Sequence, residues 1–273
     1  MNAEHWAQQD TGHWPEPIEV LNPGGRSPVL LLCEHASNHL PAEYRELGLP
    51  ADELTGPLAW DPGAAEVTRL LARALDATAF LATYSRLLID LNRPLASPHS
   101  IVACARATDI PGNRRVSQAE RERRAKLVFA PFHARVAAEI EQRRGSGGEC
   151  VMIAIHSFTP TYLGQTRPWH AGVLFDRATQ LGSSILAQLR RDPALDVAPN
   201  APYALSAEDD YSLPTHGDAC GNPALQIEIR QDLLADRGGA QAWADRIAAA
   251  LRDGLSTSDE VAQRRMLRAR GFK

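Results

Sequence analysis

The chain has 273 residues, a net charge of -4 at pH 7, and 44% hydrophobic and 23% charged residues. This composition is typical of a globular protein and argues against a disordered or coiled-coil chain. The mild negative charge argues against a nucleic-acid partner, and no apolar run approaches the roughly 20 residues of a membrane helix. A chain of this length buries enough surface to fold without a structural metal, so a metal site is expected to be functional.

The first 23 residues are polar and contain prolines, without the basic and then apolar order of a secretory signal. Four scattered cysteines form no CxxC pair, which favours a reducing, cytoplasmic setting. No glycine-rich linker or internal repeat divides the rest of the chain. We therefore expect a polar N-terminal extension over 1–23, a single domain over 24–258, and a charged C-terminal tail over 259–273.

Short apolar runs alternate with amphipathic segments along the chain. The runs predict strands buried on both faces, over Pro28–Cys33, Ala79–Ala82, Leu87–Leu91, Val151–Ile155, Ala171–Phe175 and Leu225–Ile229. The amphipathic segments predict helices over Gly63–Ala77, from Ser117 towards Gly145, over Thr179–Arg191 and over Gln241–Arg252. Buried strands separated by helices indicate an α/β fold, a three-layer α/β/α sandwich with a mostly parallel sheet.

Three local patterns refine these helices. Asp61 and Pro62 are typical of an N-cap followed by proline at the first helical position. Ser117 and Glu120 form the pattern of a capping box, which predicts the start of the long basic helix. Pro131 lies inside that helix and is expected to kink it.

Polar residues that can do chemistry follow several of the predicted strands. In parallel α/β sheets, ligands bind beyond the carboxyl ends of the strands. Those positions hold Glu34, His35, Asn38 and His39 after the first strand, Asp90, Asn92 and Arg93 at the third, His156 and Ser157 after the fourth, and Glu228 on the last. Two histidines and several carboxylates at neighbouring strand ends favour a metal site.

A hydrolytic zinc site explains these residue types, because catalytic zinc takes three protein ligands and leaves one position for water. His35 and His156 are the expected nitrogen ligands. Asp61 is the preferred third ligand, because a short excursion of the chain returns it to His35. Glu34 and Asn38 stay open as alternatives, although an amide is a poor zinc ligand.

The remaining candidates suit proton transfer or substrate binding. Glu228 is expected either to form a salt bridge with an arginine such as Arg230 or to act as a general base beside a metal. Asn92 and Arg93 suit recognition of a substrate carboxylate, and Arg86 is either a second anion contact or a surface residue.

At these residues the sequence resembles the N-formylglutamate amidohydrolase family. The matching segments are Leu31–Pro41, Trp60–Ala64, Tyr84–Pro94, Ile153–Pro160, Asn200–Tyr203, and His216–Gly217 leading to Gln226–Asp232. No single segment is decisive, but six segments in the right order are hard to obtain by chance. The family is similar to zinc carboxypeptidases and aspartoacylases, which implies a mixed-sheet sandwich of the zinc-exopeptidase, phosphorylase/hydrolase-like type.

The resemblance also implies roles for individual residues. His35 and His156 match the two histidine ligands of one zinc ion per chain, Asn92 and Arg93 match a pair that grips the substrate carboxylate, and Glu228 matches a late glutamate that activates water. His216, in the loop before the last strand, would stabilise the oxyanion or hold substrate. The third ligand departs from the relatives, because Asn38 stands where they have a glutamate.

We therefore expect a zinc-dependent amidohydrolase that cleaves a small N-acyl amino acid such as N-formyl-L-glutamate. A divergent first motif leaves the acyl group and the amino acid open. Two alternatives remain: a metal- or ligand-binding protein without catalysis on the same fold, and a metal-free serine or cysteine hydrolase, which the lack of a GxSxG motif disfavours. The number of subunits is not set by the sequence, and a homo-oligomer is compatible with it.

Overall fold

The computed structural model describes residues 14–105 and 107–257 of the chain. Its centre is a seven-stranded sheet with the strand order β1-β3-β2-β6-β11-β9-β10. In chain order the strands span Ile18–Leu21 (β1), Val29–Cys33 (β2), Thr78–Ala82 (β3), Val151–Phe158 (β6), Ala171–Leu174 (β9), Val197–Pro199 (β10) and Ala224–Arg230 (β11). Strands β3, β2, β6 and β11 are parallel, whereas β1 is antiparallel to β3 and β9 is antiparallel to β11. The predicted mixed, mostly parallel sheet is confirmed.

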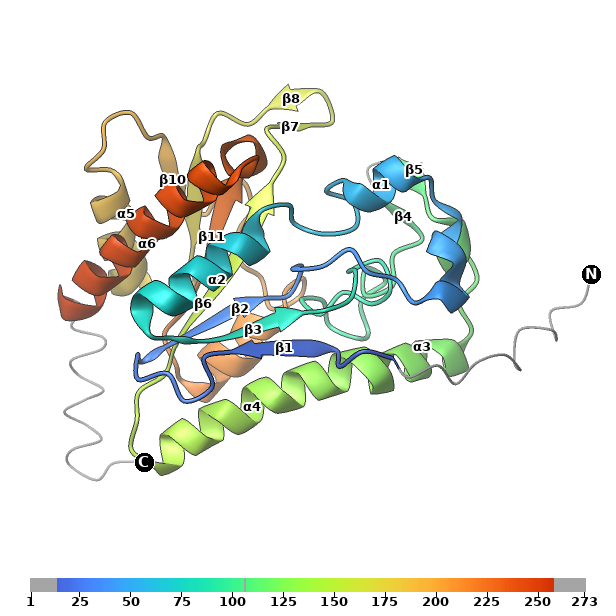
Figure 1. Cartoon of the computed structure of the whole chain (residues 1–273), viewed down its shortest axis with the longest axis horizontal. Coiled ribbons are helices and arrows are strands. Elements are labelled where there is room, and N and C mark those ends of the chain that lie inside the picture. The colour runs from blue at the N-terminus through green and yellow to red at the C-terminus, as the bar shows by residue number, and fades with distance from the viewer. Residues whose placement is uncertain (1–13, 106, 258–273) are drawn as a thin grey trace, which may run out of the picture.

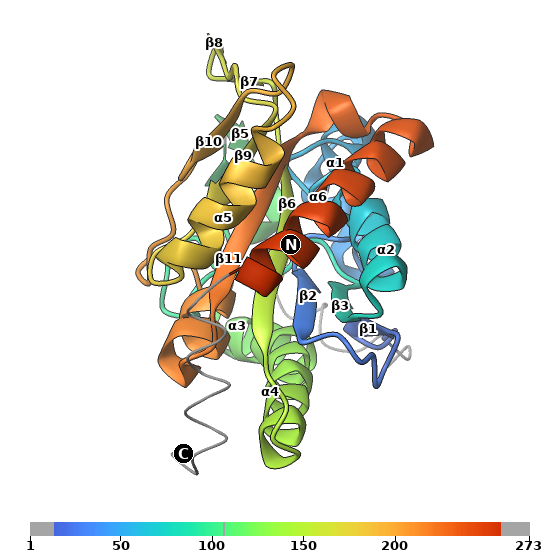
Figure 2. The same ribbon diagram turned by 90° about the vertical axis from the view of Figure 1, so that its left-hand side faces the viewer.

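Helices cover both faces of this sheet. They span Ala51–Thr55 (α1), Ala64–Leu75 (α2), Gln118–Arg124 (α3), Ala130–Gly145 (α4), Thr179–Leu189 (α5) and Arg237–Thr257 (α6). Figure 1 shows α2 and α6 on one side of the sheet and α4 on the other, and Figure 2 shows α5 beside α6. This is the three-layer α/β/α sandwich that the alternation of buried strands and helices predicts.

Strand β2 divides its side chains between two apolar cores, because successive residues of a strand point to opposite faces. Leu31 and Cys33 belong to the core beneath α2, α5 and α6. Leu30 and Leu32 belong to the core that Phe132 on α4 completes. A strand buried on both faces reads as a continuous apolar run, which is why the sequence reveals it.

Shorter elements lie outside the sheet. Two hairpins consist of Cys104–Ala105 (β4) with Thr108–Asp109 (β5), and of Thr161–Tyr162 (β7) with Gln165–Thr166 (β8). Short helical segments span Ala42–Gly48 (η2), Pro111–Asn113 (η3), Ala125–Phe129 (η4), Leu213–Gly217 (η5), Asp218–Cys220 (η6) and Gln231–Leu234 (η7).

One of the six predicted strands is wrong: Leu87–Leu91 is a buried irregular loop. Its carbonyl groups accept hydrogen bonds from side chains instead of a neighbouring strand. Asn113 donates to the Leu87 carbonyl and Arg124 to the Leu88 carbonyl, at 2.8 and 3.0 Å. A buried loop is stable when such partners satisfy its backbone, and an apolar run does not distinguish that case from a strand.

The prediction that Asp61 caps helix α2 is also wrong. Gly63 stands at the N-cap position with a φ of 83° and no side-chain cap. Glycine adopts this left-handed conformation without strain, and a Cβ there would approach Leu234 Cβ to 2.4 Å. The Asp61 carboxylate is therefore free of the helix and turns towards the ends of β2 and β6.

The long basic helix begins as the sequence predicts, with the Ser117 hydroxyl accepting a hydrogen bond from the Glu120 backbone N–H at 3.2 Å. It continues to Gly145, but a π-helical segment, η4, precedes Pro131. A π turn is a recognised way for a helix to accommodate proline's missing N–H and its ring.

The sequence predicts segments outside the domain at both ends of the chain. Strand β1, inside the predicted N-terminal extension, forms one edge of the sheet by pairing with β3. The predicted tail over 259–273 lies outside the described residues. Over residues 14–105 and 107–257, no helix is long and apolar enough to cross a membrane.

Candidate metal centre and pocket

Three side chains from separate segments meet at the carboxyl ends of β2 and β6. His35 follows β2, and His156 lies within β6, one strand over, so that their ring centroids are 4.8 Å apart. Asp61 arrives from the loop before α2, where its backbone N–H donates to the His35 carbonyl at 3.0 Å. The parallel pairing of β2 and β6 therefore brings the two histidines together, and this backbone bond adds the carboxylate.

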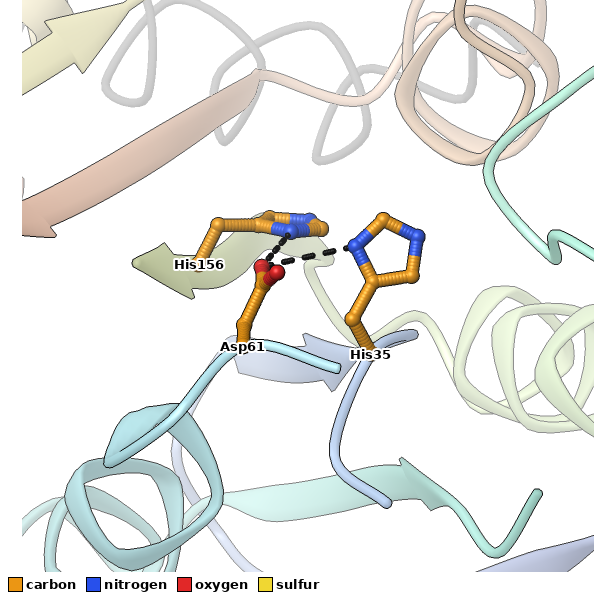
Figure 3. Close-up of side chains that lie close together, drawn as sticks. All are labelled: His35, Asp61 and His156. Atoms are coloured by element: carbon orange, nitrogen blue, oxygen red, sulfur yellow. Dashed lines mark hydrogen bonds and ion pairs between the residues drawn. The ribbon is translucent and has the colours of Figure 1, made fainter. Parts of the chain in front are cut away.

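Asp61 Oδ2 lies between the two imidazoles (Figure 3). It is 2.8 Å from His156 Nδ1 and 3.4 Å from His35 Nδ1. The three residues are buried and offer one ligand atom each, all within 4.8 Å of one another. A set of two imidazole nitrogens and one carboxylate oxygen is the donor set of many catalytic zinc sites.

The far nitrogen of each histidine faces a second carboxylate. His35 Nε2 is 2.8 Å from Asp90 Oδ1, and His156 Nε2 is 3.2 Å from Glu34 Oε2. In metal sites such a carboxylate fixes the ring orientation and makes the ligating nitrogen a stronger donor. Both Nδ1 atoms are thereby left to face the position beside Asp61.

The charges around His156 favour a cation there. Burial lowers the pKa of His156, but its interactions with the Asp61 and Glu34 carboxylates outweigh burial and raise it well above its usual value. Burial likewise raises the pKa of Glu34, yet its hydrogen bond and charge interaction with His156 bring it down to about 2. Because these carboxylates stay ionised, they stabilise a positive charge, which a metal ion supplies as well as a proton does.

The other two candidates for a third ligand point elsewhere. Asn38 Nδ2 donates to the Leu54 carbonyl at 3.0 Å. Glu34 lies beyond the far nitrogen of His156. Among the three candidates only Asp61 shares the ligand cluster with the two histidines.

Glu228 lies on β11, where its register partner on β6 is His156. Gln226 and Glu228 line a pocket, whereas Leu225, Ile227 and Ile229 pack in the core on the opposite face, as the strand alternation predicts. Burial raises the pKa of Glu228 to about 7.

Its carboxylate accepts one hydrogen bond, from Gln226 Nε2 to Oε1 at 2.7 Å. Oε2 is buried without a hydrogen-bond partner in the described part of the chain. The alternative salt bridge to Arg230 is wrong, because Arg230 pairs with Asp232 at 2.8 Å.

The pocket has a volume of about 530 Å³ and contains His35, Asp61, His156 and Glu228 in its lining. Arg86 and Arg93 also line it, and their side chains are 25% and 27% exposed. The guanidinium groups are therefore accessible from the pocket while anchored within the protein.

Aspartates anchor the two arginines and the neighbouring asparagine. Arg86 donates through Nε and NH2 to Asp90 Oδ2, at 3.1 and 2.7 Å. Arg93 donates to Asp210, and so does Asn92, at 3.2 and 3.1 Å. The sequence does not single out Asp210, because its role depends on contacts with residues more than a hundred positions away in the chain.

His216 does not belong to the pocket lining. It is buried, and its Nε2 lies 3.0 Å from His133 Nδ1. His133 in turn contacts the Leu91 carbonyl through Nε2 at 2.9 Å. Burial lowers the pKa of both rings, to about 3 for His133, so that this is a neutral buried pair. The interpretation of His133 as a packing residue agrees with these contacts.

Comparison with known proteins shows the family of this chain and solved structures with a similar fold. The sequence model of the N-formylglutamate amidohydrolase family matches residues 27–235. The crystal structure of gene product Atu2144 from Agrobacterium tumefaciens has a TM-score of 0.86 and 38% identity, covering 89% of this chain and 96% of that one.

Two more solved structures are similar. N-formylglutamate amidohydrolase from Ralstonia eutropha JMP134 has a TM-score of 0.70 and 20% identity, covering 89% of this chain and 98% of that chain, and it supports the fold. A metallo-carboxypeptidase from Burkholderia cenocepacia has a TM-score of 0.41 and 14% identity, covering 88% and 61%. A search of curated proteins gave no match.

Proposed function

This chain belongs to the N-formylglutamate amidohydrolase family, and from that premise we propose that it is a zinc-dependent hydrolase that cleaves the amide bond of a small N-acyl amino acid. The observation that carries the proposal is the buried group of His35, Asp61 and His156 in one pocket with Glu228 and two arginines. Hydrolysis of an N-acyl amino acid needs a held carboxylate, a polarised carbonyl and an activated water, and this pocket has a candidate for each.

The donor set fits a divalent metal. His35, Asp61 and His156 would hold the ion, and Asp90 and Glu34 would keep the two rings oriented. A zinc ion bound there would supply a water of lowered pKa and polarise the amide carbonyl. The two imidazoles must be neutral to bind it, so binding displaces the proton that the carboxylates otherwise hold on His156.

Glu228 is suited to proton transfer. Its pKa of about 7 lets the carboxylate take a proton from water and return it to the amine that leaves the cleaved amide. The Oε2 atom accepts no hydrogen bond from the described residues, so it is available for a water molecule. Gln226 holds Oε1 and thereby fixes the orientation of the group.

Arg86 and Arg93 would bind the carboxylate of the substrate. Arg86 donates from Nε and NH2 to Asp90, and its NH1 makes no hydrogen bond in the described structure but lies 3.7 Å from Asp61 Oδ1 as an ion pair. Arg93 uses NH1 for the Asp209 carbonyl and for Asp210. The aspartates orient these guanidinium groups before substrate arrives, which reduces the entropic cost of binding. Asn92 contributes by holding the loop at 209–212.

The two alternative functions gain no support from the pocket. Cys33 lies in the apolar core, where burial raises its pKa well above the usual value. The Ser157 hydroxyl donates to the Pro62 carbonyl at 2.8 Å and has no histidine partner among the residues that the structure describes. A protein that only binds metal has no need for a buried carboxylate of raised pKa beside the site. The cytoplasmic setting, the number of subunits and the lack of a nucleic-acid partner stay predictions.

A metal-content measurement paired with an activity screen tests the proposal. The purified chain is expected to contain about one zinc ion and to release amino acid from N-formyl or N-acetyl amino acids. Asp61→Asn should lose both properties, because an amide oxygen is a weak zinc ligand. Tight metal binding without hydrolysis of any such substrate would favour the binding-protein alternative, and full activity in a chelator would favour a metal-free mechanism.

A further inference from the structure

We propose that the substrate of this pocket carries one carboxylate and an apolar or aromatic side chain, rather than the second carboxylate of a glutamate. This inference rests on the proposed function and narrows its substrate class. It follows from three features of the described pocket: an excess of acidic groups, arginines that are already paired, and an apolar and aromatic lining.

Carboxylates outnumber guanidinium groups in this pocket. The acidic side chains among its described lining residues are Asp61, Asp90, Asp209, Asp210 and Glu228, and the guanidinium groups are Arg86 and Arg93. With these side chains charged, the described lining carries a net charge of -3, which a divalent ion at the histidines would reduce to -1. Each substrate carboxylate adds to this negative charge, so a dianion binds less favourably than a monoanion.

Both arginines are already paired with aspartates, which limits the number of substrate carboxylates that they can bind. Asp90 accepts two hydrogen bonds from Arg86, and Asp210 accepts one from Arg93. The N–H groups that remain on the two arginines can serve one carboxylate between them. A second carboxylate would have to compete with the resident aspartates, which removes most of the gain from binding it.

Apolar side chains supply part of the remaining lining. Pro57, Val102 and Ala105 are partly exposed there, and Leu58, Leu87 and Leu174 are buried behind them. Several come from the segment that follows α1 and from the region of the β4–β5 hairpin, which lie together in Figure 1. Such a lining stabilises an apolar group that leaves water, and it offers no partner for a charged one.

Two tyrosines continue this lining, and an arginine fixes them. Tyr162 on β7 and Tyr203 both line the pocket. Arg167 Cζ lies 4.5 Å from the Tyr162 ring centroid and 5.0 Å from that of Tyr203, and its NH1 donates to the Tyr203 hydroxyl at 3.0 Å. Arg167 is only 8% exposed and does not itself line the pocket. Its charge is therefore used to hold two aromatic rings at the pocket wall.

A substrate panel on the zinc-loaded protein tests the inference. The ratio kcat/KM is measured for N-formyl-L-phenylalanine, N-formyl-L-leucine, N-formyl-L-glutamate and N-formyl-L-lysine. We expect the two apolar substrates to exceed N-formyl-L-glutamate at least tenfold. An equal or higher value for the glutamate or the lysine substrate overturns the inference and leaves the amidohydrolase proposal intact, whereas no hydrolysis of any substrate overturns both.

Two variants test the aromatic wall. Tyr203→Ala should lower kcat/KM for N-formyl-L-phenylalanine about tenfold and change the value for N-formyl-L-glutamate less than twofold. Leu163→Ala is the matched control, because Leu163 is 71% exposed on the turn next to Tyr162 and does not line the pocket. Equal losses for both substrates, or no loss, would refute a role of the wall in side-chain recognition. The wild-type panel stands even if a variant fails to fold.

Discussion

Replacing Glu228 by glutamine separates catalysis from structure at the proposed site. The change keeps the shape of the side chain and removes its charge. Gln226 Nε2 can still donate to the oxygen at the Oε1 position, where the present distance is 2.7 Å. No core residue has to move, because Leu225 and Ile227 on the same strand face the other way.

The expected loss of activity follows from the role of Glu228 as the group that carries the proton. General acid–base catalysis contributes typically 10²–10⁴-fold, and an amide cannot replace it, so kcat should fall by about that factor. KM and bound zinc should change little, because neither the ligands nor the arginines are altered. This pattern distinguishes a proton carrier from a residue that binds substrate.

The same substitution has a predictable effect on stability. The pKa of Glu228 is raised from 4.5 to about 7, so the folded state favours the neutral form. The stability that the neutral carboxyl group contributes to the folded state is complete below pH 4.5 and is lost as the pH rises through 7. At pH 8.5 the charged carboxylate therefore costs on the order of 3 kcal/mol in the metal-free protein. Glutamine avoids this cost.

Steady-state kinetics, elemental analysis and urea unfolding at pH 4.5 and 8.5 measure these effects. The free energy of unfolding of Glu228→Gln, relative to the parent, should increase by about 3 kcal/mol between the two pH values. Glu208→Gln is the matched control, because Glu208 is exposed and outside the pocket lining. A kcat within tenfold of the parent, with zinc retained, would refute the general-base role.

Three further predictions concern the metal and the buried histidines. His35→Ala should lose the bound metal, as measured by elemental analysis. His39→Ala is the control and should retain the metal, because His39 is an exposed histidine of the same segment. Equal metal content in both variants would contradict the assignment of His35 as a ligand. Glu34→Gln should weaken zinc binding about 10–100-fold in a chelator competition, and unchanged affinity would mean that Glu34 does not support His156. Burial lowers the pKa of His133 to about 3, so the folded state favours the neutral ring. The stability that this preference contributes is complete above about pH 6.5 and is lost as the pH falls towards 3. Urea unfolding between pH 7 and 5 should show the parent losing up to about 1.4 kcal/mol per pH unit relative to His133→Gln, and parallel profiles would refute this.

The sequence predicts the centre of the fold well and its edges poorly. The runs that predict β2, β3, β6 and β9 are apolar without interruption because both of their faces are buried, whereas in β11 apolar residues alternate with Gln226 and Glu228, which face the pocket. Edge strands carry no such signal. Strand β1, with the sequence Ile-Glu-Val-Leu, is partly exposed throughout, and β10 has only three residues, so neither appears in the prediction.

The site is predictable to the extent that strand ends define it. His35, His156 and Glu228 follow from their positions on β2, β6 and β11, and the structure brings them to one pocket. The sequence favours Asp61 as the third ligand because a short excursion of the chain can bring it back to His35, and the backbone hydrogen bond between the two residues shows that the chain does so. The tyrosines and Asp210 are less accessible to such reasoning, because their positions depend on loops whose paths tertiary contacts decide.

The segment in which the strand prediction fails is also the segment that organises the site. In a strand, Asp90 would point to one face of the sheet and its two neighbours in the sequence to the other face. In the observed loop, Asp90 Oδ1 accepts hydrogen bonds from His35 Nε2 and from the Asn92 backbone N–H, at 2.8 and 2.9 Å. Its Oδ2 accepts two more from Arg86.

One buried carboxylate thus orients a proposed metal ligand, a proposed substrate arginine and the turn that leads to Arg93. Arg86 and His35 overcome the effect of burial and hold the pKa of Asp90 well below its usual range, so the group stays charged. Four donors from three residues, His35, Arg86 and Asn92, converge on this carboxylate. The chain departs from regular strand geometry where several polar contacts converge on one residue. The apolar pattern therefore predicts a strand wrongly at Leu87–Leu91 and correctly at the other five apolar runs.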